Sequence, residues 1–193
     1  MPRLWIDTIE AHRGEVRQAV IDAAVSLVAQ HGLVGVTMSG IAELAGIGRA
    51  TLYKYFPDIE AILFAWHQRE IERHLSHLMT ARDQVQGAEA RLEAVLRAYA
   101  MITFHSRGHG DDELAALIHR NDQVAQAERQ LHSMIKGLLS EAVGFVRQDI
   151  SSDELASYCL HALAAAARMR NKAAVSRLVS VTLSGLYATA SSA

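Results

Sequence analysis

The apolar residues of this chain recur at spacings of three and four from about residue 14 to residue 186, and no other feature constrains the fold as strongly. Residues at these spacings lie on one face of an α-helix, so each apolar row predicts a helix with one buried face. No stretch of strand length alternates apolar and polar residues with β-branched enrichment. The sequence therefore predicts an all-α fold.

Glycine and proline residues separate the apolar rows and set the expected helix boundaries. Pro57 ends one short helix, because the residue before a proline is biased away from helix. Asp58 is a suitable N-cap for the long helix that follows. We expect about nine helices, over residues 14–30, 38–44, 49–55, 58–78, 92–102, 114–118, 124–146, 155–163 and 175–186.

The composition allows a sizeable buried core and excludes several classes of protein. Half of the 193 residues are hydrophobic and only two are proline, which excludes a disordered or collagenous chain. The lone cysteine, Cys159, excludes an internal disulfide and a cysteine-based zinc site, and it fits a reducing cytosol. The most apolar run, residues 158–167, is far shorter than the roughly 20 residues that a membrane span needs. We therefore expect a soluble, cytoplasmic protein without a membrane partner.

Residues 36–56 have the pattern of a helix-turn-helix. Gly46 can take the positive φ that a sharp exit from the first short helix requires. Ile47 is placed to fill the angle between the two helices. Leu52 and Phe56, four residues apart, form the buried face of the second helix.

The outward side of the second helix is rich in hydrogen-bond donors, with small side chains between them. Such a surface suits the major groove of duplex DNA and its phosphates. The alternative is that Arg49 and Lys54 are solvated surface charges and that the tyrosines are packing residues. The outward residues are Arg49, Ala50, Thr51, Tyr53, Lys54 and Tyr55.

This stretch resembles the DNA-binding signature of the TetR (tetracycline-repressor-like) transcriptional regulators, over about residues 13–66. The resemblance implies a helix-turn-helix DNA-binding headpiece over residues 1–57 and an α-helical ligand-binding and dimerisation domain over residues 58–193. The residues that carry it are Thr37, Met38, Ile41, Ala42, Ala45, Gly46, Ile47, Arg49, Ala50, Thr51, Leu52, Tyr53, Tyr55 and Phe56.

The resemblance also implies a set of DNA contacts. Tyr53 and Tyr55 would donate their hydroxyls to phosphates, and Arg3 and Arg13, on the N-terminal arm, would reach the minor groove or the backbone. The contact residues implied by the resemblance are Thr37, Ser39, Arg49, Ala50, Thr51, Tyr53, Lys54 and Tyr55.

Two positions depart from the family pattern, and the charge of this region is low. Ile59 stands where a lysine usually touches a phosphate, and Gly48 replaces the usual capping serine, at a cost of a few tenths of a kcal/mol. Residues 1–58 carry five Lys and Arg against six Asp and Glu, a net charge of −1. Because phosphate contacts supply much of the affinity for DNA, affinity must come from local placement and from two copies in a dimer.

The last two expected helices are candidates for a dimer interface. Alanines at 162 and 164–167 leave a smooth face, and the final helix supplies an apolar stripe, so that two helices from each chain would form a four-helix bundle. The alternative is an ordinary intramolecular core. The candidate interface residues are Leu163, Ala167, Val175, Leu178, Val179, Thr182 and Leu186.

The middle helices offer apolar and aromatic residues that suit a small hydrophobic effector. Binding of the effector would favour a distance between the two headpieces of a dimer that no longer matches two major grooves of the DNA. The alternative is that these residues pack against one another. The candidate ligand-binding residues are Trp66, Tyr99, Phe104, Met134, Leu138, Tyr158 and His161.

Ten histidines raise the question of a metal or catalytic site. His67, His74 and His77 share one expected helix, and His105 and His109 flank a loop beside the acidic residues 111–113. Paired imidazoles and carboxylates are possible zinc or nickel ligands. No HExxH pair, glycine-rich phosphate loop or nucleophile elbow is present, so we expect neither metal nor cofactor nor enzymatic activity. The favoured function is a ligand-responsive repressor that binds operator DNA as a homodimer. The alternative is an all-α small-molecule-binding or adaptor protein that has lost operator binding.

Overall fold

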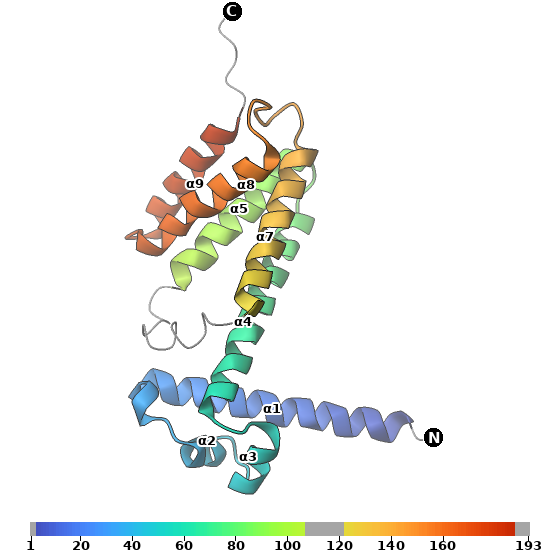
Figure 1. Ribbon diagram of the computed structural model, residues 1–193, viewed down its shortest axis with the longest axis vertical. Coiled ribbons are helices and arrows are strands. Elements are labelled where there is room, and N and C mark those ends of the chain that lie inside the picture. Colours follow the sequence, from blue (N-terminus) through green and yellow to red (C-terminus); the bar gives the residue numbers. More distant parts are fainter. Residues whose placement is uncertain (1–2, 107–121, 188–193) are drawn as a thin grey trace, which may run out of the picture. The chain divides into compact units, whose positions relative to one another are not determined.

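The computed structural model describes the backbone of residues 3–106 and 122–187, and the side chains of residues 11–106 and 124–187. Over these residues the chain is all-α, as predicted, with eight α-helices and two short 3-10 helices (Figure 1). The elements are α1 (Arg3–His31), η1 (Leu33–Gly35), α2 (Met38–Leu44), α3 (Arg49–Tyr55), α4 (Ile59–Asp83), α5 (Ala88–His105), α7 (Asp122–Glu141), α8 (Ser152–Ala164), η2 (Ala165–Arg168) and α9 (Lys172–Leu186).

Helices α4, α5, α8 and α9 run a few residues beyond the expected ranges, and α1 and α7 depart from theirs for identifiable local reasons. The expected helix at 114–118 lies outside the described residues. Helix α1 begins at Arg3 rather than near residue 14, since no proline interrupts residues 3–31 and a helical glycine costs only about 1 kcal/mol. Helix α7 ends at Glu141 rather than 146, because Gly144 takes a φ of 97° and turns the chain. Val146 is buried in that turn, where its amide donates to the carbonyl oxygen of Ala142 at 3.1 Å.

The chain divides into two compact units, Met1–Glu70 and Ile71–Ala193. The sequence places a domain boundary between residues 57 and 58, whereas the compact units divide inside α4. The reason is that the first turns of α4 pack into the first unit, where Ile62 and Ala65 are buried.

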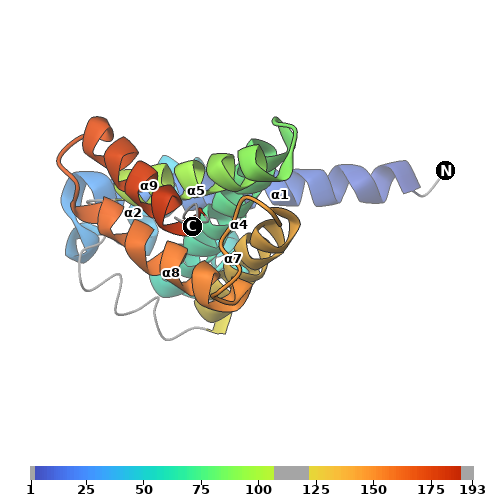
Figure 2. The same cartoon turned by 90° about the horizontal axis from the view of Figure 1, so that it is seen from above.

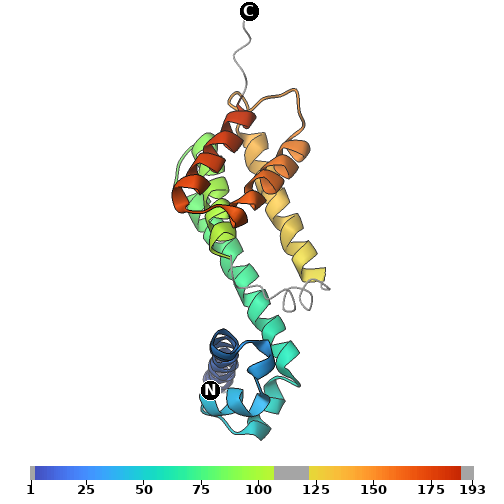
Figure 3. The ribbon, with the colours of Figure 1, turned by 90° about the vertical axis from the view of Figure 1, so that its left-hand side faces the viewer.

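The first unit is built from α1, α2, α3 and the start of α4, and α1 is seen nearly end-on in Figure 3. Arg69 of α4 ties this helix to α1, because its Nη1 atom lies 2.7 Å from Asp22 Oδ1 and donates to Gln18 Oε1 at 2.7 Å. The buried apolar side chains of the unit are Val20, Ile21, Ala23, Ala24, Val36, Ile41, Ala42, Leu52, Phe56, Ile62 and Ala65.

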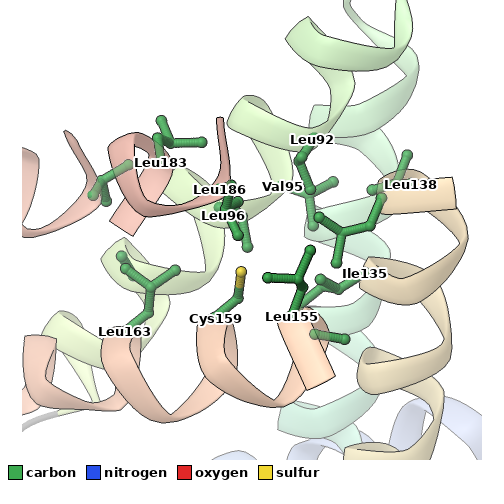
Figure 4. Close-up of a cluster of buried hydrophobic side chains, with 14 of the residues drawn as sticks. Leu92, Val95, Leu96, Ile135, Leu138, Leu155, Cys159, Leu163, Leu183 and Leu186 are labelled. Atoms are coloured by element: carbon green, nitrogen blue, oxygen red, sulfur yellow. The ribbon is translucent and has the colours of Figure 1, made fainter. Parts of the chain in front are cut away.

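The second unit packs α5, α7, α8 and α9 around one apolar core. Helix α8 lies against α7, α5 and α9. Seen from above, α5, α8 and α9 are grouped together (Figure 2). Side chains from all four helices converge in Figure 4, and burial of each large one stabilises the fold by about 1.5–3 kcal/mol. Those labelled are Leu92, Val95, Leu96, Ile135, Leu138, Leu155, Cys159, Leu163, Leu183 and Leu186.

Side-chain caps fix where α8 and α9 begin. Ser151 and Glu154 form a reciprocal capping box at the start of α8, and the Asn171 side chain accepts a hydrogen bond from the amide of Ala174 at the start of α9. Among the described helices, none combines the length and the apolar character needed to cross a membrane.

Candidate nucleic-acid interface

The turn between α2 and α3 has the geometry that the sequence predicts. Thr37 caps α2, and its Oγ1 atom accepts a hydrogen bond from the amide of Gly40 at 3.1 Å. Gly46 has a φ of 69°, and the amide of Ile47 donates to the carbonyl oxygen of Ala42 at 3.0 Å. These bonds form a C-terminal cap that ends α2 and sends the chain into α3 at a sharp angle.

Helix α3 is fixed by its inner face. Leu52 is fully buried and Phe56 is 2% exposed, as predicted from their spacing. The guanidinium group of Arg17, on α1, lies 4.6 Å from the centre of the Phe56 ring, which adds a cation–π contact between α1 and the end of α3. Ile47 is half-buried against the same core. The opposite face of α3 is therefore held rigidly toward solvent.

Arg49, Ala50, Tyr53 and Lys54 lie on this solvent face of α3 and are exposed. Arg49 Nη2 donates to Tyr53 Oη at 3.4 Å, and the guanidinium carbon lies 5.7 Å from the centre of the Tyr53 ring. The two side chains thus form one polar group at the middle of the exposed row. We call Arg49, Ala50, Tyr53 and Lys54 the α3 surface.

The other predicted contact residues are placed differently. Thr37 and Ser39 are exposed at the start of α2. Thr51 is half-buried, and Tyr55 is half-buried against the core of the first unit. The structure therefore brings Arg49, Tyr53 and Lys54 together on one exposed surface but leaves Thr51 and Tyr55 only partly accessible.

The basic side chains of the first unit differ in whether they already have a partner within the unit. Arg69 is paired with Asp22 and Arg17 lies over Phe56, so neither is a free surface charge. Arg13 is exposed on α1, within a helix rather than an extended arm, and the side chain of Arg3 lies outside the described ones. Ile59, which replaces the usual lysine, packs against the core of the first unit.

The predicted ligand-binding residues fall into three groups. Trp66 packs against the core of the first unit, whereas Tyr99, Phe104 and Met134 are half-buried against the core of the second. Burial raises the pKa of the Tyr99 hydroxyl. Leu138 is buried within that core.

The third group is exposed on α8. Tyr158 is 42% exposed, and a methyl group added at Gly185 of α9 would lie 2.9 Å from its hydroxyl oxygen. His161 is exposed, and its Nδ1 atom is 2.7 Å from the carbonyl oxygen of Ser157. Both residues therefore lie on the outside of the second unit, along α8 and α9.

Most of the predicted interface residues point inward. Their side chains are at most 1% exposed in the single chain, so they belong to the intramolecular core that the sequence left as the alternative. Ala167 and Leu178 are half-buried. The inward residues are Leu163, Val175, Val179, Thr182 and Leu186.

The sequence reasoning missed the outward row of α9. Val181 is 67% exposed, and it shares the solvent side of the helix with Arg177 and Ser184. The signal was available in the spacing, because residues 177, 181 and 184 follow one another at steps of four and three.

The reactive side chains of the described residues do not form a metal centre. No three or more His, Cys, Asp or Glu residues in the described part of the chain are grouped so that they could hold a metal ion. His109 and the acidic residues 111–113 lie outside that part. Cys159 is buried in the second unit, and burial raises the pKa of its thiol to about 12.

The capped turn, the buried inner face of α3 and its exposed outer surface define the class of helix-turn-helix proteins. Residues 20–66 match the family model of the bacterial regulatory proteins of the tetR family. Residues 87–188 match the model of the SbtR-like transcriptional regulator C-terminal domain. The chain belongs to the TetR family of bacterial regulatory proteins.

Individual relatives agree with this family. An HTH-type transcriptional regulator of Mycobacterium tuberculosis is 35% identical over 98 residues, which make up 50% of this chain and 48% of that protein. The chain thus spans about half the length of the first curated relatives that it matches. A TetR/AcrR-family regulator from Thermobifida fusca shares the fold at a TM-score of 0.69 and 17% identity, over 88% of this chain and 97% of that one. The regulator FadR from Bacillus subtilis, solved in complex with stearoyl-CoA, shares the fold at a TM-score of 0.61 and 18% identity, over 88% of this chain and 99% of that one.

Proposed function

We propose that this protein is a ligand-responsive transcriptional regulator that represses its target genes by binding operator DNA and is released by a small, mainly hydrophobic effector. The observation that carries the proposal is the α3 surface. This surface presents the guanidinium group of Arg49, the phenol of Tyr53 and the ammonium group of Lys54 to solvent. On the opposite face, the buried Leu52 and Phe56 anchor the helix in the core.

The dimensions and chemistry of the α3 surface suit duplex DNA. A helix about 10–12 Å wide fits a major groove about 12 Å wide. Arginine is the side chain that most often reads guanine there, and tyrosine hydroxyls and lysine ammonium groups donate to phosphates. Ala50 has a side chain too small to block a close approach to the bases.

A homodimer would place two such surfaces on one DNA molecule. We propose that the outer sides of α8 and α9 form its interface, because Tyr158 and Val181 are large apolar side chains exposed there. Serine and glycine residues on α9 allow a second helix to come close. Two linked headpieces would then read half-sites about 34–36 Å apart, which is one turn of DNA.

The effector would act through the second unit. Tyr99, Phe104 and Met134 supply apolar and aromatic surface that is only half-buried. The solved relative in complex with stearoyl-CoA supports an effector with an apolar chain. Helix α4 belongs to both units, so a change in its position on effector binding would alter the distance between the two headpieces of a dimer.

The test is binding to the DNA upstream of the protein's own gene, measured by fluorescence anisotropy. The double variant Arg49→Ala, Tyr53→Phe removes two donors from the α3 surface, and we expect its affinity to fall at least tenfold. Arg97→Ala is the matched control, since Arg97 is an exposed arginine of α5 paired with Glu93. All three proteins must show the same helical circular dichroism signal.

Two results would contradict the proposal. Equal affinity of the double variant and the parent would remove the α3 surface from the contact. A folded parent protein that does not bind this DNA at all, but still binds a small molecule, would favour the all-α small-molecule-binding or adaptor protein instead.

A further inference from the structure

The turn between α8 and α9 carries a dense positive charge. Four cationic residues lie within ten positions of the chain: Arg168, Arg170, Lys172 and Arg177. No Asp or Glu occurs anywhere from residue 155 to residue 193, although the whole chain has a net charge of −2. We call these four residues the basic turn.

The four cations are exposed, and within the described part of the chain none of them forms an ion pair or a side-chain hydrogen bond. Several other cations of the second unit differ from these four, because they are paired. Arg82, Arg97, Lys136 and Arg147 each pair with a neighbouring carboxylate. Four uncompensated like charges repel one another, and a bound anion would remove that repulsion.

The basic turn lies beside apolar surface of the second unit. Met169, between the first two arginines, is half-buried against the core, so its charged neighbours emerge at the edge of the apolar cluster. Helix η2, which ends at Arg168, packs against α5, and the C-terminal end of α5 lies next to this turn in Figures 1 and 3. That end of α5 carries Phe104, which is also half-buried.

We infer that the basic turn binds the anionic headgroup, a carboxylate or a phosphate, of an amphipathic effector whose apolar chain lies against the half-buried residues of α5. Guanidinium groups bind both oxyanions through two parallel hydrogen bonds. The apolar edge at Met169 favours an amphiphile over a fully hydrophilic anion such as nucleic acid. This inference rests on the proposed function, since it assigns the chemical class of the effector.

The experiment compares three ligands that share one apolar chain. Decyl phosphate, decanoate and decanol are titrated into the full-length protein by isothermal calorimetry, below their micellar concentrations and without DNA. We expect at least one of the two anions to bind tenfold or more tightly than decanol. Preference for decyl phosphate identifies a phosphate headgroup, preference for decanoate identifies a carboxylate, and equal binding of both shows that the site accepts either.

Variants locate the headgroup. The double variant Arg168→Gln, Arg170→Gln should weaken binding of the preferred anion at least tenfold and leave decanol unchanged. Arg97→Gln, a cation of the same unit that is already paired, should bind all three ligands as the parent does. Circular dichroism establishes that each variant is folded.

Several results would overturn the inference. These are equal binding of decanol and the anions, undiminished anion binding by the double variant, or no binding of any of the three. Displacement of the anions by a random DNA duplex would assign the turn to nucleic acid instead. Because no DNA is present in the main titration, failure of operator binding and failure of the headgroup site give separate readouts.

Discussion

Gly46 is the residue on which the helix-turn-helix geometry depends most directly. Its positive φ brings the amides of Gly46 and Ile47 back to the last carbonyl groups of α2, at 3.1 Å and 3.0 Å. A residue with a Cβ atom pays about 1–2 kcal/mol in this left-handed conformation. The direction of α3, and with it the orientation of the α3 surface, therefore depends on the lack of a side chain at Gly46.

We expect Gly46→Ala to lower the free energy of unfolding by about 1–2 kcal/mol. Gly137→Ala is the matched control, because Gly137 is helical and a methyl group added there meets nothing within 4 Å. That control should raise the free energy of unfolding by up to about 1 kcal/mol. Urea denaturation followed by circular dichroism measures both. A stability unchanged or raised in Gly46→Ala would argue against the observed turn.

Cys159 should be inert in the folded protein. The thiolate is the reactive form of cysteine, and burial raises the thiol pKa to about 12, so almost none is ionised at pH 8. We expect no reaction with Ellman's reagent at pH 8 until urea unfolds the second unit, and full reaction afterwards. Between pH 9.0, the ordinary pKa of the thiol, and pH 12, Cys159 is ionised in the unfolded chain but not in the folded one. The free energy of unfolding therefore falls as the pH rises through that window. Rapid labelling in native buffer would show that the thiol is accessible.

At the scale of the helices, local signals were enough to predict some boundaries and not others. The bounds of α2 and α3 are confirmed, because a threonine cap, a turn glycine and a proline mark them within a few residues. The start of α1 was wrong, because the helix continues through Gly14, the residue at which it was expected to begin. The end of α7 was wrong because Val146 continues the apolar spacing although it packs from a turn.

The inward and outward faces of α8 and α9 could not be separated by spacing alone. An apolar stripe such as Val175, Val179 and Leu186 fits an intramolecular core and a subunit interface equally well. Whether such a stripe packs in the core of its own chain or against a second subunit depends on how α5 and α7 pack, and the local sequence does not contain that information. On α3 the same reasoning predicted the inward pair, because the short segment has only one apolar pair, Leu52 and Phe56. It overstated the outward face, since Thr51 and Tyr55 are half-buried.

The cap of α8 gives a prediction for that helix. The Ser151 hydroxyl accepts a hydrogen bond from the amide of Glu154, and Ser151→Ala should lower the free energy of unfolding by about 1 kcal/mol. Ser133→Ala, at an exposed position of α7, is the control and should change it by less than about 0.5 kcal/mol.

The effect of Ser151→Ala should also depend on pH. Hydrogen bonds from Ser151 lower the pKa of Glu154, so the ionised carboxylate stabilises the cap above the ordinary glutamate range. This part of the stability is lost as the pH falls through the lowered pKa. Urea denaturation at pH 7 and at pH 3 should therefore show a smaller difference between variant and parent in acid. A larger difference in acid would contradict the role of Glu154.

At the scale of the whole molecule, the proposed function requires two copies of the chain. The exposed Val181 supports the proposed association through α8 and α9, and the α3 surface of the first unit is the proposed DNA contact. Among the described side chains, a single headpiece exposes four Lys and Arg residues, Arg13, Arg17, Arg49 and Lys54, and Arg17 lies over Phe56, so it offers few phosphate contacts. Two linked copies double that number on one stretch of DNA.

Val181→Glu should therefore produce a monomer. A glutamate at the centre of the proposed interface would bury an unpaired charge when two chains meet. Light scattering coupled to size-exclusion chromatography should give the dimer mass for the parent and for the control Gln130→Glu, on the exposed side of α7, and the monomer mass for Val181→Glu. A variant that remains dimeric would place the interface elsewhere.

The most direct test of the central claim is a hydroxyl-radical footprint of the parent protein on the DNA upstream of its own gene. Two protected regions should appear on one face of the duplex, with centres about 34–36 Å apart or a multiple of that distance. Both should vanish together in the Arg49→Ala, Tyr53→Phe variant at the same protein concentration. An unpaired region of protection, or a footprint that the double variant leaves intact, would contradict the account.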